Sequence, residues 1–332
     1  MEAKRSDLGP ESSPEFELLP RDLTPYRAGN TGIAYVHRFE SGRPGPHVLV
    51  NALTHGNEFC GMVAATHLLD SGVRPRVGTL TVSFANVAAY ESFDETRPFD
   101  SRQLVHNLNR VWSSAWLEGG EASPELKRAR ELRPAVAAAD HILDLHSTSN
   151  DVQPFWVYPH FERNGRAALA IGLPRVHLVM PLGLGSGTPV IQHGRHGDAG
   201  HHGVGLVAEC GQHFKRASGE TAKRVTMRFL AHFGLVDTDA DADDDEGAGD
   251  SAANAAPAPR RYELLQTRMV KTPAFAFIRP LLGFETFAKG ELIATDGEDE
   301  VRAPCDDCTV MMPTRRAIVG REGVYLTRPL PQ

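Results

Sequence analysis

The sequence predicts an α/β domain, with helices on both faces of a mixed, mainly parallel sheet, followed by a smaller β-rich C-terminal domain. Three observations predict this arrangement. Up to about residue 236, short apolar runs alternate with segments of helical periodicity, which is typical of a parallel sheet buried on both faces. Residues 237–259 are acidic and then rich in Ala, Gly, Ser and Pro. After residue 260 no long helical period appears, and short strand-like runs replace it.

The predicted strands of the first domain are short apolar runs that end at turn-forming residues. The run at 79–86 alternates, with Leu80, Val82 and Phe84 on one side. The other predicted strands are 47–53, 141–145, 155–159, 175–181 and 204–209.

Two helices are predicted in this domain from their apolar periodicity. The first follows residue 58, ends near Asp70, and presents one apolar face: Phe59, Met62, Val63 and Leu69. The second is predicted to start at Ser218 as its N-cap and to bury three side chains: Val225, Phe229 and Phe233.

The chain of 332 residues is long enough for two domains. We expect a flexible leader at 1–27, the α/β domain at 28–236, a linker at 237–259 and the β-rich domain at 260–332. The linker has too few apolar residues to offset the entropy lost on ordering. In the last domain, Asp296-Gly297 predicts the turn of a hairpin.

Composition excludes several classes of protein. The net charge of −7 shows no basic excess that would indicate a nucleic-acid partner. No apolar run approaches the ~18 residues needed to cross a bilayer, and the N-terminus lacks the apolar core of a signal peptide. Four cysteines in so long a chain do not form a disulfide framework. We therefore expect a cytoplasmic enzyme or binding protein without a membrane partner; its oligomeric state stays open, a homo-oligomer included.

Polar residues that could hold a metal ion follow two of the predicted strands. His55 and Glu58 lie three residues apart in "THGNE", and His146 follows a second strand in "HILDLHSTSN". Ligands gather outside the carboxyl ends of the strands of an open α/β sheet, so these side chains are predicted to share one crevice. Two histidines and one carboxylate form a zinc set that leaves a position open for water. Asp144 lies on the same strand face as His146 and is a candidate partner of its imidazole.

A base and anion-binding groups are also present. Glu209 ends the strand "VGLVAE", and a carboxylate there would enter the same crevice as a candidate general base. The segment "SRQLVHNLNRVW" supplies Arg102, Asn109 and Arg110, which could bind an anionic substrate and a developing oxyanion.

Four phrases, "THGNE", "NLNR", "DLHSTSN" and "VAECG", occur in this order and closely resemble the succinylglutamate desuccinylase/aspartoacylase family, relatives of the zinc carboxypeptidases. The resemblance spans roughly residues 47–235 and extends more weakly to the C-terminal domain. It implies a zinc-carboxypeptidase-like fold. It also implies a zinc-dependent amidohydrolase acting on linear amides, with a small N-acyl amino acid as substrate and one Zn²⁺ per chain.

Carried over residue by residue, the resemblance makes His55, Glu58 and His146 the zinc ligands. Glu209 takes the place of the family's general base and acid, and Arg102 that of the arginine that polarises the scissile carbonyl.

The resemblance also assigns substrate contacts. Asn109 and Arg110 match the pair that grips the substrate's α-carboxylate. Tyr325, in "REGVYL", matches a substrate-contacting tyrosine. The chain departs from the family at Asn107, because family members commonly have an acidic residue directly before L-N-R.

Three features lie outside these motifs. We interpret the His- and Gly-rich segment 192–203 as a mobile loop rather than as a second metal site. Arg195 in this segment is a candidate for binding a second carboxylate of the substrate. Cys305 and Cys308 form a lone C-x-x-C, which is half of a zinc ribbon, so we interpret them as free thiols. Cys60 and Cys210 are interpreted as packing residues.

Two alternatives remain open at this point. A zinc carboxypeptidase acting on peptides uses the same metal set and a similar carboxylate clamp. A non-catalytic ligand-binding relative would keep the fold without the reaction. A C-terminal domain that caps the cleft would favour the acylase. The sequence names neither the acyl group, nor the amino acid, nor the metal used in the cell.

Overall fold

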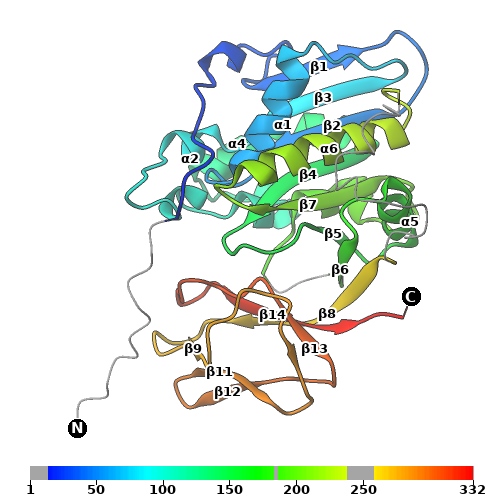
Figure 1. The fold of residues 1–332 in the computed structure, drawn as a ribbon. Coiled ribbons are helices and arrows are strands. Elements are labelled where there is room, and N and C mark those ends of the chain that lie inside the picture. The colour runs from blue at the N-terminus through cyan, green and yellow to red at the C-terminus, as the bar shows by residue number, and fades with distance from the viewer. Residues whose placement is uncertain (1–13, 183–185, 238–257, 332) are drawn as a thin grey trace.

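The computed structural model describes residues 14–182, 186–237 and 258–331. In this part of the chain, eleven strands form one sheet with the order β1-β3-β2-β4-β7-β5-β6-β8-β14-β13-β10. Figure 1 shows the strands running from β1 at one edge to β8 and β14 near the C-terminal part, with α6 crossing one face. The predicted fold class is confirmed.

The strands of the sheet's first part are β1 (Val36–Glu40), β2 (His47–Ala52), β3 (Thr79–Phe84), β4 (His141–Thr148), β5 (Phe155–Pro159), β6 (Val176–Met180) and β7 (Val204–Gln212). The helices are α1 (Phe59–Asp70), α2 (Val87–Glu91), α3 (Ser114–Glu118), α4 (Pro124–Ala138), α5 (Glu162–Ile171) and α6 (Arg216–His232). Short 3-10 helices are η1 (Thr24–Tyr26), η2 (Asp100–Arg102), η3 (Leu108–Arg110), η4 (Val190–Gln192) and η5 (Gly194–Gly197).

The sheet is mixed, and its central strands are parallel. β2 pairs in parallel with β3 and β4, and β4 pairs in parallel with β7. β5 runs antiparallel to β7 and parallel to β6. All six predicted strands of this region are confirmed. The three central strands β2, β4 and β7 therefore deliver their carboxyl ends to one edge of the sheet.

Neighbouring residues of the central strands enter two different cores. On β2, Leu49 packs with α4 on one face, whereas Val50 packs with α1 and α6 on the other. Ile142 and Leu143 divide in the same way on β4. A strand covered on both faces needs apolar side chains at successive positions, which explains the continuous apolar runs of the sequence.

The start of α6 differs from the prediction. The helix begins at Arg216 with Lys215 as its N-cap residue, so Ser218 lies inside the first turn. The Ser218 hydroxyl donates a hydrogen bond of 2.7 Å to the Lys215 carbonyl oxygen instead of accepting one from a helix N–H. The prediction of Ser218 as N-cap is therefore wrong, although the inward-facing Val225 and Phe229 are buried as expected.

The described part of the predicted leader contacts the α/β domain. Leu23 and Tyr26 are buried in the core beside α1. The backbone N–H groups of Glu17 and Leu18 both donate to the Phe214 carbonyl oxygen, at 2.9 and 2.8 Å. Residues 1–13 and most of the predicted linker lie outside the described residues, so the predicted domain bounds stay predictions.

The C-terminal part consists of strands and turns within residues 258–331. Its strands are β8 (Arg260–Met269), β9 (Ala276–Phe277), β10 (Thr286–Phe287), β11 (Leu292–Asp296), β12 (Asp299–Arg302), β13 (Cys308–Met311) and β14 (Glu322–Pro329). β8 pairs in parallel with β6 and antiparallel with β14, so the C-terminal strands continue the large sheet. β11 and β12 form the hairpin predicted at Asp296-Gly297, with Asp296 opposite Asp299.

None of the helices in the described ranges combines the length and the apolar character that a membrane crossing requires.

The turn after β2 is held in a narrow space at Gly56. A Cβ atom there would lie 2.4 Å from the Ser101 carbonyl oxygen and 2.5 Å from the Tyr90 backbone nitrogen. Both are backbone atoms, which cannot rotate away as the end of a side chain can. A larger residue would therefore displace the turn that carries His55 and Glu58.

We predict that Gly56→Ala lowers the free energy of unfolding by about 1–3 kcal/mol, the usual cost of overpacking a filled site. Urea denaturation measures this change. Gly120→Ala is the control, because no atom lies within 4 Å of its added Cβ; it should shift stability by less than ~1 kcal/mol. Equal stabilities for the two variants would contradict this account of the turn.

Candidate active site

Three predicted metal ligands meet beneath the carboxyl ends of β2 and β4. Glu58 lies between the two imidazoles: its Oε1 is 2.8 Å from His55 Nδ1 and its Oε2 is 2.8 Å from His146 Nδ1. The ligand atoms of the three residues all lie within 4.8 Å of one another. Each residue is only 1–2% exposed. In the described part of the chain this is the one group of three or more such side chains close enough to share an ion.

Burial and charge act against each other in this cluster. Burial alone would raise the pKa of Glu58, but the neighbouring His55 and His146 hold it well below its usual range. Burial lowers the pKa of His55 to about 4, and the Arg102 charge acts in the same direction. Burial would lower the pKa of His146 too, yet Asp144 and Glu58 raise it well above its ordinary value. Glu58 and His146 thus favour each other's charged forms despite their burial.

Each imidazole has a second partner on its other nitrogen. His146 Nε2 lies 2.7 Å from Asp144 Oδ2, which is the contact expected from their spacing. Asp144 Oδ1 accepts hydrogen bonds from Asn51 Nδ2 at 2.8 Å and from the Thr54 hydroxyl at 2.7 Å. Such outer contacts fix the orientation of ligand imidazoles in metal sites.

His55 has a corresponding partner that the sequence did not predict. Its Nε2 lies 2.9 Å from Asn107 Oδ1. Both Nδ1 atoms therefore face the Glu58 carboxylate, and both Nε2 atoms are used elsewhere. Two imidazole nitrogens and one carboxylate, held in this way, fit a divalent metal ion.

Glu209 lies beside this cluster on the neighbouring strand. It is the register partner of His146 in the parallel pair of β4 and β7, so the two side chains share a face of the sheet. Its Oε2 is buried and has no hydrogen-bond partner in residues 14–182, 186–237 and 258–331. Burial raises the pKa of Glu209 to about 8, against the opposing charge of His146. A buried carboxyl with a raised pKa beside a metal-type cluster is typical of acid–base sites.

Arg102 approaches the cluster from η2. Its Nη1 donates to Glu58 Oε1 at 2.9 Å, while 31% of its side chain stays exposed. The guanidinium therefore bridges the buried cluster and the open cleft above it.

Arg110 contacts the C-terminal strand β14. Its Nη2 donates to both Glu322 carboxylate oxygens, at 2.9 and 3.1 Å, and to the Tyr325 hydroxyl oxygen at 3.2 Å. The Tyr325 hydroxyl in turn donates to Glu322 Oε2 at 2.8 Å. Burial alone would raise the pKa of Glu322, but Arg110 lowers it below its usual range. Glu322 was missed in the sequence, although it stands in the same "REGVYL" phrase as Tyr325.

Asn109 and Asn107 differ from each other in burial and in their place relative to the cleft. The Asn109 side chain is buried, and its Oδ1 accepts a hydrogen bond of 3.1 Å from the Val190 backbone. Asn107, two residues earlier, lines the cleft. The sequence marked Asn107 only as a departure from the family, without a role.

A cleft of about 1160 Å³ lies above the cluster and is lined by both parts of the chain. Its wall combines apolar residues such as Phe99, Trp116 and Phe284 with charged ones. Among the described residues, two acidic side chains line it, Asp100 and Glu322. Six arginines of the same ranges line it: Arg97, Arg102, Arg110, Arg315, Arg316 and Arg321. A chain of net charge −7 thus concentrates positive charge in this cleft.

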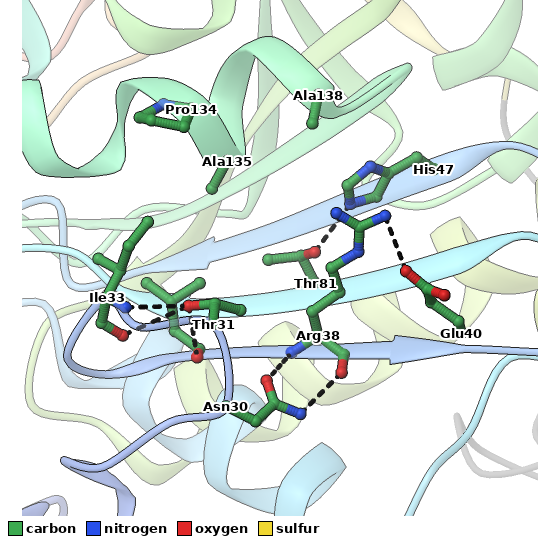
Figure 2. A pocket seen from close by; sticks show the side chains of 11 residues that line it. Asn30, Thr31, Ile33, Arg38, Glu40, His47, Thr81, Pro134, Ala135 and Ala138 are labelled. Atoms are coloured by element: carbon green, nitrogen blue, oxygen red, sulfur yellow. Dashed lines mark hydrogen bonds and ion pairs between the residues drawn. The ribbon is translucent and has the colours of Figure 1, made fainter.

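A smaller cavity of about 360 Å³ lies between β1, β3 and α4. Figure 2 shows the Arg38 guanidinium directed toward Glu40. Arg38 Nη2 lies 2.9 Å from Glu40 Oε1. His47 Nε2 lies 2.7 Å from the Thr81 hydroxyl. His47 begins β2, whereas His55 follows the carboxyl end of this strand. This cavity is therefore separate from the cluster of predicted metal ligands.

The segment 192–203 lies at the opposite end of the sheet. Arg195 Nη1 contacts Asp140 Oδ1 at 3.1 Å, and Asp140 directly precedes the amino end of β4. The cleft is at the carboxyl end of this strand. The prediction that Arg195 binds a second substrate carboxylate is therefore wrong. The four cysteines are free thiols, with Cys60 and Cys210 buried as predicted.

The chain resembles known proteins in sequence and in fold. The model of the succinylglutamate desuccinylase/aspartoacylase catalytic domain matches residues 44–232, more than half of the chain. The rat N-acyl-aromatic-L-amino acid amidohydrolase (carboxylate-forming) is 34% identical over 122 residues, covering 33% of this chain and 35% of that protein. Its Xenopus laevis counterpart is 31% identical over 118 residues, covering 33% and 36%. The match thus spans about a third of the length of these relatives.

Solved structures share the fold. Succinylglutamate desuccinylase from Vibrio cholerae has a TM-score of 0.64 at 16% identity, covering 89% of this chain and 85% of that one. The succinylglutamate desuccinylase/aspartoacylase from Rhodobacter sphaeroides has a TM-score of 0.59 at 18% identity, covering 87% of each chain. At this level of identity, the likeness shows the fold alone.

We predict that His146→Ala weakens binding of a divalent metal by more than the ~10–100-fold that loss of an outer partner costs. The variant removes one of three protein ligands. Competition with a chelator, followed by metal analysis, measures the affinity and the stoichiometry. His160→Ala is the control, because His160 is exposed. Unchanged affinity in His146→Ala would place the metal elsewhere.

Proposed function

This chain belongs to the succinylglutamate desuccinylase/aspartoacylase family, and we propose that it is a zinc-dependent deacylase that hydrolyses the amide bond of N-acylated amino acids. The observation that carries the proposal is the His55–Glu58–His146 cluster with Glu209 beside it, whose Oε2 has no hydrogen-bond partner among the described residues. The names of the rat and Xenopus relatives support N-acyl amino acids as the substrate class.

His55 Nδ1, His146 Nδ1 and a Glu58 oxygen would hold the zinc ion. Zinc in this set would supply Lewis acidity, which makes water acidic near neutral pH and draws electrons from a carbonyl oxygen. Since the two Nε2 atoms are engaged by Asp144 and Asn107, the imidazoles need no reorientation to present Nδ1.

Glu209 would move the proton. No partner of its Oε2 lies in the described part of the chain, so this oxygen is available to accept a proton from the attacking water and to pass it to the leaving nitrogen. The carboxylic acid formed in the first step can then donate its proton to the leaving nitrogen in the second.

Arg102 would stabilise the oxyanion that develops on the amide oxygen. Its guanidinium already contacts Glu58 Oε1 and remains partly exposed to the cleft. Asn109 and Arg110 would hold the substrate's α-carboxylate, Asn109 through its amide nitrogen because Val190 engages its oxygen. Tyr325 lies against Arg110 and would contact the same group.

The charge of the cleft supports an anionic substrate. Six arginines and two acidic residues line it, so a free carboxylate is attracted into the cleft before it reaches Arg110. The C-terminal part forms one wall, including residues 282–284 and 312–316. A wall at this position favours short acyl amino acids over long peptides. A carboxypeptidase, by contrast, accepts peptides.

We predict that the zinc-loaded protein hydrolyses N-acyl amino acids with a free α-carboxylate. Amidation of that carboxylate should lower kcat/KM by a factor that corresponds to about 2–5 kcal/mol, because the substrate loses its charged contact with Arg110. A panel of N-acetyl, N-formyl and N-succinyl amino acids, each with its carboxamide, measures both. A peptide with the same free carboxylate is the comparison substrate. Faster cleavage of the peptide would indicate a carboxypeptidase, and zinc binding without any hydrolysis would indicate a binding protein.

We predict that Glu209→Gln lowers kcat by at least ~10²-fold and leaves zinc content unchanged. Glutamine resembles the protonated carboxyl in size and charge, so the melting temperature should also stay close to that of the parent protein. Steady-state kinetics, metal analysis and thermal unfolding measure the three quantities. Glu162→Gln is the control, because its side chain is 81% exposed. Loss of zinc would make Glu209 a ligand, and retained activity would place the base elsewhere.

A further inference from the structure

We propose that Glu125, a fully buried carboxylate, is a positioning residue: it holds the loop 103–106 and thereby sets the distance between the two arginines, Arg102 and Arg110, that flank this loop. Its effect on the reaction rests on the proposed function. Its hold on the loop is a property of the fold and is measured separately.

Three successive backbone N–H groups of the loop converge on the Glu125 carboxylate. Its Oε1 accepts hydrogen bonds from Leu104 at 2.6 Å and from Val105 at 3.4 Å. Its Oε2 accepts from Val105 at 3.3 Å and from His106 at 3.2 Å. A buried carboxylate is costly unless hydrogen-bond donors surround it. Consecutive backbone N–H groups that point at one anion supply such donors.

The place of Glu125 on α4 also suits a negative charge. α4 has Ser123 as its N-cap residue and Pro124 at the start of the helix, so Glu125 lies in the first turn. The aligned peptide dipoles of a helix stabilise a negative charge there. One carboxylate thus joins the loop to the N-terminal end of a helix of 15 residues.

The loop forms part of the cleft wall between two groups that the proposed reaction uses. It directly follows Arg102, and η3, which ends in Arg110, begins two residues after it. Gln103, Leu104 and His106 line the cleft. The position of the loop therefore sets the distance between the backbones of the two arginines.

Other contacts hold the far ends of these arginines. Glu58 accepts a hydrogen bond from the Arg102 guanidinium. Glu322 accepts from the guanidinium of Arg110. Glu125 instead holds the backbone between them. In the proposed reaction one substrate contacts Arg102 through its amide oxygen and Arg110 through its α-carboxylate. A shift of the loop would move one contact relative to the other and misplace the amide.

Glu125→Gln in the full chain tests the hold on the loop. Glutamine has nearly the size of glutamate, but it lacks the charge, and its NH2 group would face N–H donors where an oxygen now accepts. The amide hydrogens of Leu104, Val105 and His106 should therefore exchange with solvent at least ~10-fold faster than in the parent protein. Hydrogen exchange followed by NMR measures this rate residue by residue.

Kinetics of the same variant test the effect on the reaction. Its kcat/KM for an N-acyl amino acid at saturating zinc should fall by ~10–100-fold, because a misplacement of about 1 Å can cost on the order of 10²-fold. Zinc affinity should stay parent-like, since the three predicted ligands lie outside the loop. A role in stability alone would lower the melting temperature and leave the kcat/KM of the folded protein unchanged.

A second pair of variants keeps the carboxylate and removes one donor. Leu104→Pro deletes the N–H that makes the shortest of these hydrogen bonds. Gln103 before it is extended, with φ −157° and ψ 156°, which is the conformation that a residue preceding proline adopts. Leu104→Ala is the matched control, because it also removes the leucine side chain but keeps the N–H. We expect a lower kcat/KM in Leu104→Pro than in Leu104→Ala.

Glu118→Gln is the surface control, because its side chain is 60% exposed, and it should change none of these quantities. Parent-like exchange in Glu125→Gln would overturn the hold on the loop. Parent-like kcat/KM in Glu125→Gln, equal values in the two Leu104 variants, or loss of zinc from Glu125→Gln would overturn the positioning role. If the parent protein hydrolyses no N-acyl amino acid, the proposed function fails, and the exchange rates still decide whether Glu125 holds the loop.

Discussion

The buried carboxylate of Glu58 is the constraint on which the rest of the site depends. A carboxylate with 1% exposure is costly unless charged or hydrogen-bonding partners surround it. His55 and His146 lie 2.8 Å from its two oxygens, and Arg102 donates to one of them. To satisfy this one group, the turn after β2, the middle of the sheet at β4 and the η2 segment must all meet at one point.

Rigid elements hold the partners of Glu58 in place. Behind His146, the Asp144 carboxylate is fixed by Asn51 and Thr54, and Ser83 donates to Asn51. These residues come from β2, the turn after it, β3 and β4, so three neighbouring strands support one imidazole. The register of β4 and β7 then places Glu209 beside His146. A site built on strands keeps its geometry better than one built on loops.

Local periodicity and motif order predicted much of this arrangement from the sequence. The central strands are buried on both faces, so their apolar runs are unmistakable, and His55, Glu58 and His146 follow such runs directly. The contacts missed in the sequence join distant segments. Arg110 and Glu322 are 212 residues apart in the chain, and no local sequence pattern predicts their ion pair. The prediction for Arg195 was wrong for the same reason, because its partner Asp140 lies at the other end of the sheet. The N-cap prediction for Ser218 was wrong because serine is favoured at an N-cap but also fits the first turn of a helix. There its hydroxyl donates to the carbonyl oxygen of Lys215, three residues earlier.

The central claim is that one zinc ion bridges His55, Glu58 and His146. Diffraction from crystals of the zinc-loaded protein, recorded on both sides of the zinc absorption edge, tests it most directly. We expect one anomalous peak, ~2.0–2.2 Å from His55 Nδ1, His146 Nδ1 and a Glu58 oxygen. A peak bound through either Nε2, or a zinc ion at another cluster with none at Glu58, would contradict the account.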